Sequence, residues 1–456
     1  MKPLTRTWKN LSPGNVLILY YAVSILVGSA ALCLPWAVNG PPLPFLDALF
    51  TATSAQCVTG LIVVDTGTRF TLFGQSVILL LIQTGGLGIT TFSVFLFFYL
   101  GRGVSLRGRW LIQETLLHTP VGSLGELLRS IFWLTLIIEG IGAALLAVSF
   151  VPDLGWSQGL FSALFHSVSA FCNAGFSLFS DSLIGYRNSP LVNLTIMGLI
   201  ILGGIGFLVI CEVLEFMRRR NERRRLSLHA KLVLWTTLIL IVGGALAIGL
   251  LERKAGLRGM GFGEGVWTSL FQSVTARTAG FNTIDLNRFE VPTLVLMMFL
   301  MFVGASPGSS GGGIKTTSLA LFVAILHSRL KGSQHTNVFR RTIPDELVTK
   351  TLTLVMLAAL LVGFCAFWLL SVQMSGLSFS ESRGVFMDYM FEVVSAFATV
   401  GLSLGATAKL VPAGKVIIIL LMFVGRVGLL TAAFAIIRRS REDTVVRYAE
   451  ENIMIG

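Results

Sequence analysis

The chain has 456 residues, of which 54% are hydrophobic and only 13% are charged, whereas an ordinary soluble domain has about 25% charged residues. So few charges cannot cover the surface of a soluble protein of this length, and the mean hydropathy is +0.79. These values exclude a soluble enzyme, a disordered scaffold and a secreted disulfide module, and they predict an integral membrane protein with short tails.

The formal net charge is +12, but the basic residues lie in short clusters between apolar runs. Such clusters set the orientation of a membrane protein, and they lack the interleaved aromatic residues typical of nucleic-acid binding. The five cysteines are scattered, without a CxxC or Cys/His cluster, so the sequence indicates neither a disulfide framework nor a zinc site.

Eight apolar segments are long enough to cross a bilayer as helices of about 20 residues. The first follows three basic residues and lacks a small-residue cleavage site, so we interpret it as a span and not as a removed signal peptide. In chain order the segments lie near 15–36, 76–100, 131–151, 191–217, 230–251, 291–326, 351–373 and 415–437.

Within each successive pair of spans lies a semi-polar stretch that carries a shorter apolar run. These runs are too short to cross the bilayer and are typical of re-entrant half-helices. They lie near 44–57, 157–172, 265–278 and 385–399.

The distribution of Lys and Arg predicts the orientation of the spans. With the N-terminus in the cytoplasm, the inner segments hold 22 of the 35 basic residues and the outer segments hold 10. The third outer segment, with Arg253, Lys254 and Arg258, departs from this bias without reversing it. We therefore expect both termini in the cytoplasm and every half-helix to enter from outside.

The four half-helices end in similar sequences, which read SAQCVTGL (54–61), AFCNAGFSL (170–178), TARTAGFNT (275–283) and SAFATVGLSLG (395–405). Each contains a glycine, and Gly60, Gly175, Gly280 and Gly401 are 115, 105 and 121 residues apart. A single glycine in an apolar helix is usually a packing contact, but four in one context indicate an internal repeat. The predicted repeats are 1–110, 111–228, 229–345 and 346–456, the last with a cytoplasmic tail.

Four such loops at membrane depth can bind a cation. Backbone that leaves a helix inside a bilayer must be buried in protein or line a wet cavity, and glycine permits angles that turn a carbonyl toward an axis. A ring of carbonyls can replace the water shell of a monovalent cation, and the carboxyl ends of the half-helices favour positive charge. The predicted ion-binding residues are Val58, Thr59, Gly60, Asn173, Ala174, Gly175, Thr278, Ala279, Gly280, Thr399, Val400 and Gly401.

These loops, with a glycine-rich stretch in the sixth segment, resemble the Trk/Ktr/HKT superfamily of cation transporters, and within it the membrane subunits of bacterial Ktr systems. The resemblance covers nearly the whole chain. It implies an all-α integral membrane fold, with four span–half-helix–span repeats (eight transmembrane helices) around a pseudo-fourfold central pore. Trk-type relatives have an extra pair of spans, whereas Gly60 leaves room for one span before it.

The resemblance also implies what the protein transports and what it binds. Plant sodium-selective relatives have serine at the first filter position, so glycine at all four implies potassium selectivity, with potassium bound at the filter residues only. A homodimer in the bacterial inner membrane is implied, with passive uptake that sodium often stimulates. A cytoplasmic KtrA-type ring would bind ATP or ADP, since no nucleotide site is visible in this chain. The clusters Arg218–Arg220 and Arg223–Arg225 fit contact with anionic lipid, and such a ring would dock on the same face.

The sixth segment is interrupted at 304–318, where glycines, a proline and small polar residues cannot continue a helix. A phosphate-binding loop nearly fits 308–316, but it needs one residue fewer and a soluble strand before it. A packing kink is a second alternative. We predict instead an intramembrane gate just below the filter, as the resemblance also implies. The predicted gate residues are Gly304, Ala305, Ser306, Pro307, Gly308, Ser309, Ser310, Gly311, Gly312, Gly313, Lys315 and Arg426.

Arg426 lies in the eighth span, where a charge is costly and usually faces the protein interior. It follows its filter glycine by 25 residues, and Gly304 follows its own by 24, so the two should lie at similar depth. We predict that Arg426 contacts the gate loop and narrows or regulates the pore. The alternative is a buried pair with a carboxylate such as Glu139.

Three further polar residues lie in the half-helices. Arg277 and Glu392 are predicted to support the filter loops, singly or as a pair, without touching the ion; an exposed position at the outer mouth is the alternative. His166 fits a hydrogen-bonded packing residue better than a ligand. Asn173 is placed to hydrogen-bond a neighbouring loop.

Other functions fit the sequence less well. A secondary transporter with broken helices would need paired inverted halves, whereas these repeats share one orientation. A membrane enzyme would need a reactive cluster, and no HExxH, GxSxG or paired-carboxylate motif stands in a span. A Trk-type potassium transporter subunit remains the nearest alternative.

Overall fold

The computed structural model describes residues 13–103, 124–218, 226–376 and 378–429, without the side chains of 13, 89–103, 124–127 and 379. The N-terminal segment, the predicted repeat boundary near 110, most of the basic cluster at 218–225 and the C-terminal tail lie outside the described residues.

The described chain is helical, apart from loops, short 3₁₀ turns and one small hairpin of β1 (Asn337–Val338) and β2 (Arg341–Thr342), in which Asn337 lies opposite Thr342. The helices are α1 (Pro13–Leu32), α2 (Phe45–Gln56), α3 (Thr66–Arg69), α4 (Leu72–Gly103), α6 (Leu124–Leu154), α7 (Trp156–Phe171), α8 (Pro190–Ile205), α9 (Phe207–Arg218), α10 (Leu228–Glu252), α11 (Phe262–Thr275), α12 (Val291–Phe302), α13 (Thr316–Leu330), α14 (Asp345–Gln373), α15 (Phe379–Ala398) and α16 (Pro412–Val427).

Within the described residues, four helices are long and apolar enough to cross a membrane: α1, α6, α10 and α14. They match the first span of each predicted repeat. The second spans are less regular, because α8 and α9 meet at 103° at Gly206 and a loop separates α12 from α13. The prediction of a helical protein is confirmed for most of the described chain, with the hairpin of β1 and β2 as a departure, and its apolar helices fit a membrane protein. The count of eight spans stays a prediction.

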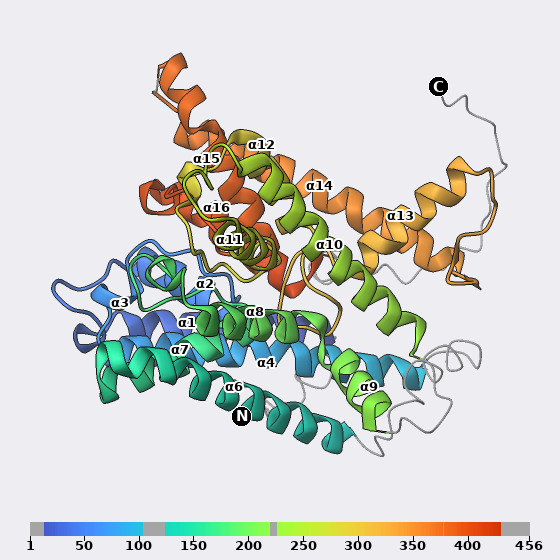
Figure 1. Cartoon of the computed structure of the whole chain (residues 1–456), viewed down its shortest axis with the longest axis horizontal. Helices are drawn as coiled ribbons and strands as arrows, with labels where there is room; N and C mark the ends of the chain where they lie inside the picture. The colour runs from blue at the N-terminus through green and yellow to red at the C-terminus, as the bar shows by residue number, and fades with distance from the viewer. Residues whose placement is uncertain (1–12, 104–123, 219–225, 377, 430–456) are drawn as a thin grey trace, which may run out of the picture.

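The half-helices α2, α7, α11 and α15 each end within five residues of their glycine. Each packs on its own repeat and also on the second span of the preceding repeat: α2 on α16, α7 on α4, α11 on α8 and α15 on α12. The contacts therefore run around a closed circle. Figure 1 shows the first two repeats in blue and green on one side and the last two in yellow and red on the other.

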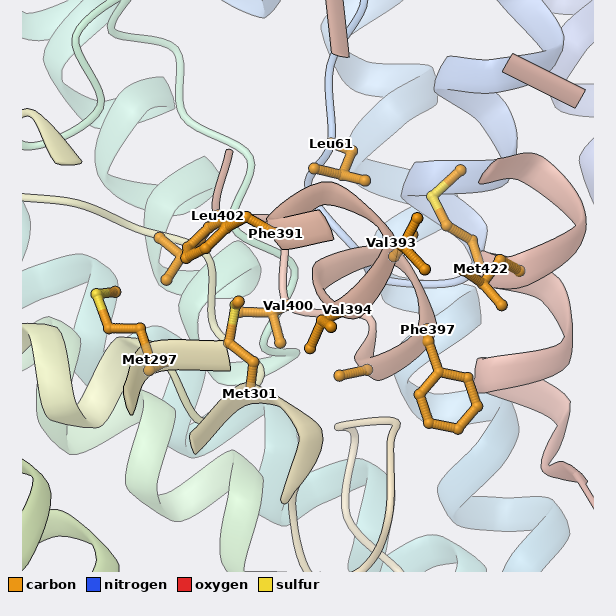
Figure 2. Close-up of a cluster of buried hydrophobic side chains, with 14 of the residues drawn as sticks. Leu61, Met297, Met301, Phe391, Val393, Val394, Phe397, Val400, Leu402 and Met422 are labelled. Atoms are coloured by element: carbon orange, nitrogen blue, oxygen red, sulfur yellow. The ribbon is translucent and has the colours of Figure 1, made fainter. Parts of the chain in front are cut away.

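A buried apolar cluster holds α15 in place. Figure 2 shows it around α15, with Met297 and Met301 of α12 on one side and Met422 of α16 on the other. Because lipid is as apolar as these side chains, close packing and not transfer from water stabilises such contacts in a bilayer.

Glycines in the second spans allow the half-helices to approach closely. A Cβ added at Gly85, Gly203 or Gly425 would lie 1.8–2.0 Å from the carbonyl oxygen of Gln56, Phe171 or Phe397. Each of these carbonyls belongs to the fourth residue before a filter glycine. In the third repeat the equivalent glycine, Gly304, meets Gly312 of the broken segment instead, where the Cβ would lie 2.1 Å from the carbonyl oxygen.

We predict that Gly203→Ala destabilises the protein by about 1–3 kcal/mol, because the added methyl group overlaps the Phe171 carbonyl. Gly198→Ala is the matched control in the same helix, since among the described residues no atom lies within 4 Å of its Cβ position. Thermal unfolding of the two purified variants in detergent measures the difference. Equal unfolding midpoints would contradict the packing described here.

Candidate ion-binding site

The four loops after the half-helices share one backbone conformation. The residue two before each glycine is left-handed, with φ of 56° at Val58, 61° at Asn173, 65° at Thr278 and 50° at Thr399. The glycines follow with φ between 69° and 96°. Left-handed conformations cost free energy for residues other than glycine, and they persist only where surrounding contacts impose them.

Hydroxyl groups in the last turn of each half-helix impose these conformations. Ser54 and Ser395 accept the N–H groups of Gly60 and Gly401, both at 3.1 Å. In the other two repeats the hydroxyl donates instead: Ser169 to the carbonyl of Phe176 at 2.8 Å, and Thr275 to that of Phe281 at 2.6 Å. The sequence analysis did not identify these residues, although the aligned half-helices show a Ser or Thr five or six residues before every glycine.

The four glycines form a closed ring in chain order. A Cβ on Gly60 would lie 2.4 Å from the carbonyl oxygen of Ala174, and one on Gly175 would lie 2.8 Å from that of Ala279. The ring continues from Gly280 to Val400 at 2.3 Å and closes from Gly401 to Thr59 at 2.1 Å. Any side chain at these positions would therefore displace a carbonyl of the next loop.

This arrangement brings the twelve predicted ion-binding residues together. The carbonyls of Thr59, Ala174, Ala279 and Val400 lie at the ring, and the half-helices present their carboxyl ends to it. Such a ring offers oxygen ligands and negative helix-dipole ends without a fixed carboxylate, which suits a weakly held, dehydrated monovalent cation.

The residues between α12 and α13 lie directly against the filter loops. The N–H of Gly312 donates to the Thr399 hydroxyl at 3.1 Å, and a Cβ on Gly311 would lie 2.2 Å from the Thr278 hydroxyl oxygen. Ser310 donates its hydroxyl to the carbonyl of Phe171 at 3.1 Å. The predicted gate loop thus contacts the second, third and fourth half-helix ends.

Further hydrogen bonds hold this loop to α8 and within itself. The N–H groups of Ser306 and Ser310 donate to the carbonyls of Gly204 and Gly203, at 3.0 and 3.3 Å. Lys315 donates from Nζ to the carbonyl of Gly311 at 2.7 Å.

Arg426 reaches the gate loop from α16. It donates to the carbonyl of Ser310 in the loop, to the carbonyl of Gly85 at 2.8 Å and to the Tyr21 hydroxyl at 3.3 Å. The similar spacings in the sequence, 25 residues from Gly401 to Arg426 and 24 from Gly280 to Gly304, predicted this proximity. Glu139 does not serve as its partner, because the Glu139 carboxylate accepts from Gln83 at 3.0 Å and from the Cys172 thiol at 3.9 Å.

The two predicted support residues have separate partners. Arg277 donates to the Thr237 hydroxyl at 3.4 Å, and Glu392 accepts from the Thr407 hydroxyl. Both side chains are buried, so neither takes an exposed position at an outer mouth. Among the described residues no ion pair joins them. The Asn173 amide lies 3.2 Å from the Thr278 hydroxyl and so does hydrogen-bond a neighbouring loop.

Known proteins resemble this chain over nearly its whole length. Residues 15–448 match the family described as TrkH, cation transport protein. The chain is 40% identical to the Ktr system potassium uptake protein B of Bacillus subtilis, over 98% of both chains. It is 37% identical to the potassium/sodium uptake protein NtpJ of Enterococcus hirae, over 99% of both.

A solved structure shows the same fold. The potassium transporter TrkH from Vibrio parahaemolyticus matches with a TM-score of 0.73 at 20% identity, covering 94% of this chain and 85% of that one.

We predict that Gly401→Ala destabilises the protein more than Gly405→Ala does. Both glycines have positive φ, 90° and 87°, so the backbone penalty of about 1 kcal/mol is common to both. Only Gly401 adds an overlap, with the Thr59 carbonyl, which should cost about 1–3 kcal/mol more. Unfolding midpoints in detergent measure this difference, and equal shifts would show that the ring is not closely packed.

Proposed function

Because the chain belongs to the TrkH cation transport family, we propose that it is the ion-conducting membrane subunit of a bacterial Ktr-type potassium uptake system. It is a transporter subunit and not an enzyme. The observation that carries the proposal is the closed ring of four glycines, in which each glycine lies against the carbonyl before the next one.

In this function the ring is the selectivity filter. Potassium loses its water shell and is held by the carbonyls of the residues before and at the four glycines. The carboxyl ends of α2, α7, α11 and α15 favour the cation electrostatically. Passage is passive, down the electrochemical gradient.

The filter belongs to four repeats, over 1–110, 111–228, 229–345 and 346–456, which form eight spans around a pseudo-fourfold pore. The circular packing of half-helices on the preceding repeat supports this arrangement. The excess of basic residues in the inner segments supports an inner-membrane protein with both termini in the cytoplasm.

The loop predicted at 304–318, of which the structure leaves 304–315 non-helical because α13 begins at Thr316, acts as the gate below the filter. Arg426 holds it closed. The Arg426 guanidinium donates to neutral carbonyl oxygens, which do not cancel its positive charge. That charge lies near the proposed pathway and repels potassium. Arg277 and Glu392 support the filter loops from behind without touching the ion.

The proposed assembly is a homodimer on a cytoplasmic KtrA-type ring, which binds ATP or ADP and regulates the gate. Sodium acts as an activator, an assignment supported by the name of the relative NtpJ as a potassium/sodium uptake protein.

We predict that Gly280→Ser reduces the preference for potassium over sodium by at least tenfold, because its side chain displaces the Val400 carbonyl. Uptake of both ions is measured in cells that lack their own potassium importers and co-express a KtrA-type partner. Gly265→Ser, at the far end of the same half-helix, is the control. If Gly280→Ser transported with unchanged preference, the filter would be refuted and a secondary transporter with broken helices would become the leading function.

We predict that Arg426→Gln raises potassium uptake and weakens its dependence on the partner ring. A charge-assisted hydrogen bond contributes about 1.5–3 kcal/mol, so its loss should favour the open gate about tenfold or more. Arg426→Lys keeps the charge but lacks the guanidinium fork that reaches three oxygens at once, and it should fall between the wild type and Arg426→Gln. Lower uptake by Arg426→Gln at equal protein level would contradict a closing role.

A further inference from the structure

We infer that His166 positions the second filter loop, and through it the third, by orienting the Ser177 hydroxyl. This inference rests on the proposed filter. It assigns a role in selectivity to a side chain that the sequence analysis interpreted as packing.

The repeat places His166 at a distinctive position. The ninth residue before each filter glycine is Thr51, His166, Phe271 and Glu392 in turn. Thr51 donates to the carbonyl of Asp47 in its own helix, and Phe271 is part of the apolar core. Of these four side chains, only His166 and Glu392 form a hydrogen bond beyond the half-helix, and their repeats lie opposite each other in the ring.

The hydrogen bonds of His166 determine its tautomer. The side chain is fully buried, with Nδ1 2.7 Å from the carbonyl oxygen of Ser162 and Nε2 2.9 Å from the Ser177 hydroxyl. Because a carbonyl only accepts, Nδ1 carries the proton, and Nε2 of the neutral ring accepts from Ser177. The ring stacks on Phe179 with centroids 4.6 Å apart, in an apolar setting that disfavours its charged form.

Ser177 has one proton and two acceptors within reach. The second is the carbonyl of Ser182 at 3.4 Å, and the shorter bond to His166 takes the proton. The Ser177 oxygen also accepts the N–H of Phe179 at 3.0 Å. His166 thus decides in which direction the Ser177 hydroxyl points, two residues after the filter glycine Gly175.

The same segment holds the third filter loop. The Ser182 hydroxyl accepts the N–H of Asn282 at 3.2 Å, and the N–H of Leu183 donates to the Asn282 carbonyl at 3.0 Å. Asn282 is two residues after Gly280. Without His166 as acceptor, the Ser177 proton turns to Ser182 and changes the junction that joins the two loops.

In the fourth repeat a carboxylate, and not an imidazole, connects the half-helix to the segment after its glycine. Glu392 is fully buried and accepts from the Thr407 hydroxyl, whose oxygen lies 3.2 Å from the hydroxyl oxygen of Ser403, two residues after Gly401. The ring is therefore held from behind at two opposite loops. Discrimination between ions depends on the positions of the carbonyl oxygens. Loss of either connection should therefore lower the preference for potassium at substitutions that leave the amount of folded protein unchanged.

The test is a double-mutant cycle with potassium and sodium uptake as the readout, in the cells described above. His166→Phe keeps the aromatic packing but removes the acceptor, and Ser177→Ala removes the donor. Each should reduce potassium preference about three- to tenfold, the effect of one hydrogen bond, and the double variant should be no worse than either. His166→Gln, which keeps both a donor and an acceptor, should restore most of the preference.

Phe179→Leu is the control, because it removes the stacked ring and leaves the hydrogen bond. If it impaired selectivity as much as His166→Phe, or if the two variants of the cycle were additive, His166 would be a packing residue and the inference would be wrong. Gly175→Ser distinguishes a failure of this inference from a failure of the proposed filter. If Gly175→Ser alters the preference for potassium while His166→Phe and Ser177→Ala keep it unchanged, the inference alone is overturned. If Gly175→Ser itself leaves the preference unchanged, the proposed filter is overturned.

Discussion

Backbone that leaves its helix inside a bilayer finds no water, so every polar group there needs a partner in the protein. In the proposed arrangement four half-helices end at such a place, and most of the distinctive residues of this chain follow from that constraint. Ser54, Ser169, Thr275 and Ser395 supply hydroxyl partners for the turns. Gly85, Gly203 and Gly425 let the second spans approach the helix ends. The carbonyls that remain turned to the ring are then available to an ion.

The repeats are alike at the ring and differ below it. In three repeats a span glycine packs on a half-helix carbonyl, whereas in the third Gly304 packs on Gly312 of the broken segment. That exchange places a non-helical loop against the ends of the second, third and fourth half-helices. Arg426 of the fourth repeat fixes the loop from the neighbouring side through Ser310. In the proposed function, selection by a symmetric ring and control by a single loop can therefore coexist in one chain.

The sequence predicted what depends on local pattern and on repeat spacing. The run at 44–57 became α2 (Phe45–Gln56), and similar offsets from the four glycines placed Arg426 beside the predicted gate loop. The bend at Gly206 was missed, because the apolar run at 191–217 continues through it unchanged. The separate partners of Arg277 and Glu392, and the bond from His166 to Ser177, depend on how segments pack in space, which neither hydropathy nor spacing encodes.

The most direct measurement is the position of the ion itself. Crystals of the protein grown with Rb⁺ or Tl⁺ in place of K⁺ would give anomalous density for the bound cation. The account predicts density on the axis of the ring, among the carbonyls of Thr59, Ala174, Ala279 and Val400. Cation density elsewhere in the protein, with none at this ring, would contradict it.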